Sequence, residues 1–60
     1  MTPNDIKELR KKNKLTQVEF AEKLGVVSIT VKRWESGTAR PSQLALRQLA
    51  RLQKKALKED

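Results

Sequence analysis

The sequence has no cysteine and no histidine, and only 3% of its 60 residues are aromatic. Without cysteine there is no disulfide, and without cysteine and histidine an ordinary zinc site is excluded. The same absences remove the commonest catalytic nucleophile and base, and the remaining residues form no catalytic or metal-binding pattern. We therefore expect a protein that is not an enzyme and that needs no cofactor or metal.

Long apolar runs are also missing. No run approaches the roughly 18–20 apolar residues that a membrane span requires, and the first residues, MTPNDIKEL, lack the apolar stretch of a signal peptide. We expect a cytoplasmic protein with no membrane partner. The length allows one small domain, covering residues 1–60.

The charge is strongly one-sided. Fourteen lysines and arginines stand against seven aspartates and glutamates, which gives a net charge of +7. A small basic domain usually binds a polyanion. Charge alone does not separate DNA from RNA or from an anionic membrane, and it can also serve solubility alone.

Caps and periodicity predict an all-α domain of four helices, and strand signals are absent. The first helix is expected over Pro3–Lys12, with Thr2 and Asp5 forming a capping box and Asn13 ending it in a left-handed conformation. Ser42 is expected to cap the fourth helix, which then continues to the end of the chain.

The two middle helices are joined by a glycine. Thr16 and Glu19 form a second capping box, and Gly25 supplies the positive φ that ends this helix. The third helix is expected over Ser28–Ser36. Its start is weak because Val27 has no capping oxygen. Either Ser28 caps a shorter helix, or about 1 kcal/mol of capping stability is lost.

The third helix has two different sides. Val31 and Trp34 share one side, which we expect to be buried in the core. The opposite side carries the residues of a DNA-contacting surface: Ser28, Ile29, Lys32 and Arg33. Two short helices with a tight turn place the second helix in the major groove of DNA.

Each of these residue types suits a different contact. Arg33 can pair bidentately with guanine, and Ile29 can touch a thymine methyl. Ser28 suits a base or a phosphate, and Lys32 suits a phosphate.

The fourth helix has more leucine than one core-facing stripe needs. We expect Leu44, Leu52 and Leu57 to be exposed, and such a stripe favours self-association. From Thr38 to Lys58 the chain has six basic residues and no acidic one.

A spaced motif extends from about Ile6 to Ala50: Leu15-Thr16-Gln17, Phe20-Ala21, Leu24-Gly25-Val26, Thr30-Val31, Arg33-Trp34-Glu35, Gly37 and Pro41-Ser42. It resembles the helix-turn-helix of lambda-repressor-like regulators, a family that comprises phage repressors, Cro, Xre-type proteins and antitoxin-type members. The motif places the helix-turn-helix at residues 16–36. Val27 and Ile29 depart from the family pattern, which usually has a capping Ser or Thr and a polar residue there.

The resemblance implies roles for further residues. It implies that Gln17 binds the DNA backbone and braces the base-contacting residues. It also implies that Ser28, Ile29 and Arg33 face bases, that Arg10 pairs with Glu35, and that the loop from Ser36 through Thr38 to Arg40 grips phosphates. Many members have a fifth helix, but too few residues remain here, so one extended fourth helix is expected.

Together these features predict a sequence-specific regulator of transcription that binds double-stranded DNA as a homodimer, represses by occluding a promoter, and associates with the nucleoid. The main alternative is a coactivator-like or antitoxin-like module whose fourth helix docks a toxin or another protein. RNA binding is disfavoured because no surface aromatic is expected for base stacking. A membrane-surface role for the fourth helix lacks an interfacial aromatic.

Overall fold

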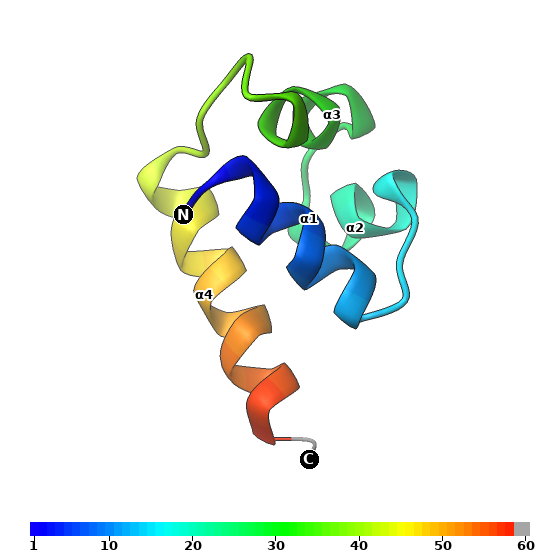
Figure 1. Ribbon diagram of the computed structural model, residues 1–60, viewed down its shortest axis with the longest axis vertical. Helices are drawn as coiled ribbons and strands as arrows, with labels where there is room; N and C mark the ends of the chain where they lie inside the picture. Colours follow the sequence, from blue (N-terminus) through cyan, green and yellow to red (C-terminus); the bar gives the residue numbers. More distant parts are fainter. Residues whose placement is uncertain (59–60) are drawn as a thin grey trace.

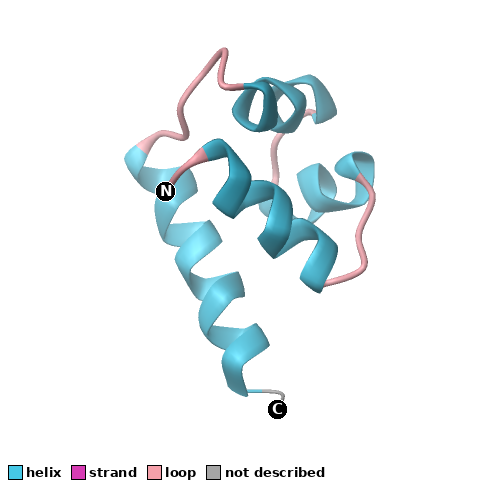
Figure 2. Ribbon diagram, viewed as in Figure 1, coloured by secondary structure: helices cyan, strands magenta, loops and turns pink. Residues whose placement is uncertain are grey.

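The chain folds into four helices in a computed structural model that describes the backbone of residues 1–58 and the side chains of residues 1–54 (Figure 1). The helices are α1 (Pro3–Lys12), α2 (Gln17–Leu24), α3 (Ser28–Ser36) and α4 (Gln43–Lys58). Over residues 1–58 the chain contains helices and loops but no strand (Figure 2). The predicted all-α class is confirmed. Because α4 runs unbroken to Lys58, these residues hold no fifth helix.

Helix α1 begins at a capping box. The Thr2 hydroxyl accepts a hydrogen bond from the Asp5 backbone N–H (3.1 Å), and the Asp5 carboxylate accepts one from the Thr2 N–H (3.0 Å). The bond from the Thr2 backbone, helped by the Thr2 side chain, holds the pKa of the Asp5 carboxyl below its ordinary value. These bonds favour the charged form of the carboxyl.

The end of α1 differs from the prediction, because Asn13 is not left-handed. Its φ is −89°, and the left-handed residue is Lys14, with φ 57°. The Asn13 side chain donates to the Leu9 carbonyl (2.8 Å), which keeps this residue on the last turn of the helix. The chain therefore reverses one residue later, and the Leu15 N–H returns to the Arg10 carbonyl (3.2 Å).

Helix α2 is fixed at both ends by its own sequence. The Thr16 hydroxyl accepts from the Glu19 N–H (3.1 Å), and the Glu19 carboxylate accepts from the Thr16 N–H (2.9 Å). At the other end Gly25 has φ 74°, and the Val26 N–H donates to the Ala21 carbonyl (2.9 Å). Glycine adopts this φ without steric cost, so the chain turns sharply into α3.

One hydrophobic core joins the four helices. Helices α1 and α2 each contact both α3 and α4, and Figure 1 shows α3 at one edge of this arrangement. The buried side chains are Ile6, Leu9, Phe20, Ala21, Val31, Trp34, Leu49 and Leu52. Helix α3 thus has its inner side on the core and lies at one edge of the molecule.

The set of exposed leucines on α4 differs from the prediction. The Ser42 hydroxyl accepts from the Ala45 N–H (3.2 Å), as expected for its cap. Leu52 is only 7% exposed, so the prediction that it is exposed is wrong. It lies three residues after the buried Leu49, on the same side of the helix. Leu44 is exposed, whereas Leu57 lies outside the side chains that the structure describes.

Among the side chains that the structure describes, the exposed leucines of α4 do not form one stripe. Leu44 and Leu46 are both exposed, but residues two positions apart lie about 200° apart around a helix. Up to Lys54, the leucines therefore serve the core at Leu49 and Leu52 and leave two separated exposed side chains. Within the part of the chain that the structure describes, no helix is long and apolar enough to cross a membrane.

Candidate nucleic-acid interface

Helix α3 separates its apolar side from its polar side. Val31 and Trp34 are buried in the core, which holds the helix from behind. Gly37, with φ 82°, ends the helix. The residues predicted to contact DNA from this helix all lie on its exposed side: Ser28, Ile29, Lys32 and Arg33.

The exposed side of α3 carries only positive charge. Lys32 and Arg33 are exposed, and the first turn of the helix has no acidic residue. The one acidic residue of α3 is Glu35, whose side chain is 4% exposed and pairs with Arg10. The negative charge of α3 is therefore buried in an ion pair, whereas its positive charges are exposed to solvent. Such a surface attracts phosphate groups.

The start of α3 is uncapped. Val27 occupies the N-cap position with φ −82° and ψ 153°, and no side chain accepts a hydrogen bond from the first turn. Ser28 is therefore the first helical residue rather than the cap, so the second of the two predicted arrangements is the one observed.

Val27 is a surface residue that the sequence-based prediction did not include in the interface. It is 64% exposed, and Ile29, two residues later, is 48% exposed. A signal was present in the sequence, because an N-cap residue without a polar group has its side chain outside the helix. An exposed apolar side chain at the start of this helix suits contact with a thymine methyl group.

A partly buried ion pair ties α1 to α3. The Arg10 guanidinium binds Glu35 twice, Nε donating to Oε2 at 2.7 Å and Nη2 donating to Oε1 at 3.1 Å. Its Nη1 donates to the Leu15 carbonyl (3.0 Å), just before α2 begins. The two side chains are 14% and 4% exposed, so the weak energetics of surface pairs do not apply. Loss of either partner would leave the other charge poorly solvated.

Gln17 joins this ion pair from the first turn of α2. Its side-chain Nε2 donates to Glu35 Oε1 (3.2 Å), and the residue is half-buried. The glutamine was expected to brace the base-contacting residues. In the structure its amide binds Glu35, whose side chain is buried, and not one of the exposed residues of α3.

The other predicted phosphate contacts lie at two separate places at the end of α3 and in the loop after it. The Ser36 and Thr38 hydroxyls share a hydrogen bond of 2.9 Å, and the Ser36 hydroxyl also lies 3.2 Å from the Arg33 carbonyl, to which it donates. These two residues are therefore brought together beside Arg33. Arg40 is exposed, but it borders a different feature.

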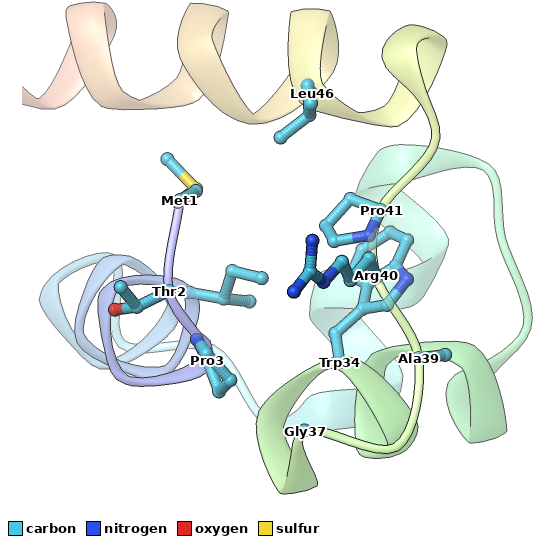
Figure 3. Close-up of a pocket in the computed structure, with 10 residues that line it drawn as sticks. Met1, Thr2, Pro3, Trp34, Gly37, Ala39, Arg40, Pro41 and Leu46 are labelled. Atoms are coloured by element: carbon cyan, nitrogen blue, oxygen red, sulfur yellow. The ribbon is translucent and has the colours of Figure 1, made fainter.

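That feature is a groove of about 440 Å³ between the N-terminal segment, the loop and α4. Figure 3 shows Arg40 extending into the space between Met1, Pro41 and Trp34. Arg40 is thus not grouped with Lys32 and Arg33.

Among the described residues, no group of acidic side chains could hold a metal ion. The arrangement offers instead a cationic helix face, hydroxyls at its end and an amide held at the neighbouring helix start. These are the groups that contact base edges and phosphates in DNA complexes.

Comparison with known proteins gives one match. The model of the helix-turn-helix family HTH_3 matches residues 6–57, a range that includes α2 and α3. No curated protein and no solved structure matches the chain significantly. The family consists of DNA-binding regulatory domains and is not enzymatic. The chain belongs to this helix-turn-helix family, that of lambda-repressor-like and Xre-type proteins.

Proposed function

We propose that this protein binds double-stranded DNA sequence-specifically and regulates transcription, with α3 in the major groove. The observation that carries the proposal is the charge separation on α3. Lys32 and Arg33 face solvent, while Glu35 turns inward to Arg10. A rigid helix with a purely cationic outer side and a brace behind it is suited to this groove.

Four residues of α3 divide the contacts to bases and phosphates. Arg33 pairs with guanine, Ile29 touches a thymine methyl, and Lys32 contacts a phosphate. Ser28 contacts a base or a phosphate from the first turn. Val27, exposed at the N-cap position of α3, adds a second apolar contact.

Further contacts to the DNA backbone come from the start of α2, the end of α3 and the loop that follows. Gln17 supplies an amide, Ser36 and Thr38 supply hydroxyls, and Arg40 supplies a guanidinium. With about six phosphate contacts from lysine and arginine over the whole surface, the logarithm of affinity should fall with the logarithm of salt with a slope of about −5.

The biological role follows from occupancy of a promoter. The protein acts as a cytoplasmic repressor that binds as a homodimer and associates with the nucleoid. Two half-sites one helical turn apart would supply the affinity that one small domain lacks. With Leu52 in the core, a dimer contact through α4 has to use other side chains.

Selection of bound sequences from random duplex DNA tests this function. We expect a preferred sequence at moderate salt, and symmetric half-sites if the protein binds as a dimer. A library that shows no preference would contradict sequence-specific binding.

Two substitutions then separate base contacts from phosphate contacts. Arg33→Ala should lower discrimination at one base position by about 1–3 kcal/mol. Lys32→Ala should weaken all sequences equally and reduce the salt slope by about 1. Lys54→Ala, an exposed charge on α4, controls for loss of net charge. An equal effect of Arg33→Ala on every base substitution would remove Arg33 as a base contact.

A protein-docking role through α4 is the second candidate, and the exposed Leu44, 69% accessible, favours it. In that case the partner is a toxin or another protein, and DNA binding is secondary. Leu44→Asp would then abolish association and spare DNA binding, whereas loss of Lys32 and Arg33 would do the reverse. Leu52 is unsuitable for this test because it is buried.

A further inference from the structure

We propose that Glu35 is a positioning residue that holds the Gln17 amide ready to donate to a DNA phosphate. The inference rests on the proposed function, since it concerns how the same surface grips the DNA backbone. It begins from one contact, the hydrogen bond of 3.2 Å from Gln17 Nε2 to Glu35 Oε1. The two residues come from the first turn of α2 and the last turn of α3.

Glu35 cannot rotate freely. Its Oε2 accepts from Arg10 Nε (2.7 Å), and its Oε1 accepts from Arg10 Nη2 (3.1 Å). Arg10 is itself held by its bond to the Leu15 carbonyl (3.0 Å). The carboxylate is therefore a fixed acceptor, and the glutamine that binds it adopts one orientation rather than many. A free glutamine side chain would lose this rotational freedom only on binding DNA.

The amide retains a donor for a ligand. A glutamine NH₂ group has two N–H bonds, and Glu35 Oε1 takes one of them. Gln17 is half-buried, so part of the residue reaches solvent. It is the first residue of α2, next to the positive end of that helix, where an anion is favoured. A phosphate at this point can accept the second N–H.

The charge of Glu35 has to be neutralised for this arrangement to work. An unpaired carboxylate beside a phosphate would repel it. Arg10 forms a bidentate pair with Glu35, and the pair as a whole has no net charge. Arg10 thereby allows a carboxylate to orient a phosphate-binding group.

A double-mutant cycle on DNA affinity tests the proposal. Gln17→Met keeps the length of the side chain and removes its hydrogen bonds. In the unaltered protein it should weaken binding to duplex DNA about two- to tenfold, equally for all sequences. In a Glu35→Met background the same change should weaken binding less than twofold, because no carboxylate is left to hold the amide. The cycle cancels the added net charge of Glu35→Met.

The outcomes separate this proposal from the proposed function. An equal loss from Gln17→Met in both backgrounds overturns the positioning role while leaving DNA binding intact. Absence of binding to any duplex overturns both proposals. Gln53→Met, an exposed glutamine on α4, is the matched control and should not change affinity.

A second measurement applies even if Glu35→Met unfolds the domain. In the nitrogen-15 NMR spectrum of the unaltered protein, the Gln17 side-chain amide should exchange with water more slowly than that of Gln53. Adding duplex DNA should shift one Gln17 amide proton strongly and the other weakly. Exchange as fast as that of Gln53, or equal shifts of both protons, overturns the proposal.

Discussion

Helices α2 and α3 are of similar length and pack against each other, but their first turns are held differently. At α2, Thr16 and Glu19 form reciprocal hydrogen bonds, and the Arg10–Glu35 pair holds the preceding Leu15 carbonyl. At α3, Val27 provides no side-chain cap. The difference shows that α2 is anchored by a cap at its start, whereas α3 is positioned by the glycine turn, by its buried side and by the Arg10–Glu35 pair near its end.

The uncapped start has a consequence for the surface. The first N–H groups of a helix need partners from outside the helix, and at α3 these partners are not side chains. The same position exposes the Val27 side chain. The domain thus lacks a side-chain cap at the residue for which an apolar contact with DNA is proposed.

The largest effect is expected from Arg10→Met. This change leaves the Glu35 carboxylate buried and unpaired, and it releases the Leu15 carbonyl, so it should destabilise the fold by about 3–5 kcal/mol. A domain of this size has about 3–5 kcal/mol in total, so the variant should be largely unfolded. Circular dichroism and Trp34 fluorescence measure this. The double variant Arg10→Met, Glu35→Leu should recover part of the loss, and an unchanged thermal melt of the single variant would contradict the role of the pair.

Removal of the α2 cap should have the next largest effect. Thr16→Ala should lower the free energy of unfolding by about 0.5–2 kcal/mol in urea titrations. Ser28→Ala is the matched change at α3 and should stay within about 0.5 kcal/mol, because Ser28 is not a cap. Equal losses in the free energy of unfolding for both variants would contradict the difference between the capped start of α2 and the uncapped start of α3.

Addition of a cap to α3 should stabilise the domain by a smaller amount. Val27→Thr supplies a hydroxyl at the N-cap position and should raise the free energy of unfolding by about 1 kcal/mol. Val18→Thr, an exposed valine within α2, controls for the change of residue type and should give no gain. A DNA affinity measured alongside shows whether the valine methyl contributes to binding.

The smallest effect concerns pH and the start of α1. The pKa of the Asp5 carboxyl is lower in the folded state, mainly through the bond from the Thr2 backbone. Its contribution to stability is therefore present above the unfolded value, near pH 4, and is lost as the pH falls through the folded value. Asp5→Asn should flatten this part of the stability profile below about pH 4. A profile unchanged by the substitution would show that the capping box adds no pH dependence.

Local signals in the sequence predicted most of the fold. The helix bounds follow from capping residues and glycines that act within three or four positions, such as the Thr16–Glu19 box and Gly25. The errors arise where distant or competing contacts decide. Asn13 is held by its own side chain on Leu9, so Lys14 takes the left-handed conformation. Leu52 is buried because the packing of α4 on the other helices sets which of its sides faces the core.

The sequence predicted which residues of the candidate site are exposed, but not the side-chain contacts that hold the site together. Periodicity placed Lys32 and Arg33 on the exposed side of α3 without any tertiary information. The contact from Gln17 to Glu35 joins residues 18 positions apart, and no local pattern indicates it. The direction of Arg40 depends on the groove formed by the N-terminal segment and α4.

The Arg10–Glu35 pair also determines how small a working fragment can be. It joins residues 25 positions apart and draws its cation from α1. A peptide containing only α2 and α3 would keep every proposed base contact but would have no counterion for Glu35. The strength of the positive surface potential on the DNA-contacting helix therefore depends on the assembled domain, and we expect excised helix-turn-helix peptides to be poor substitutes for it.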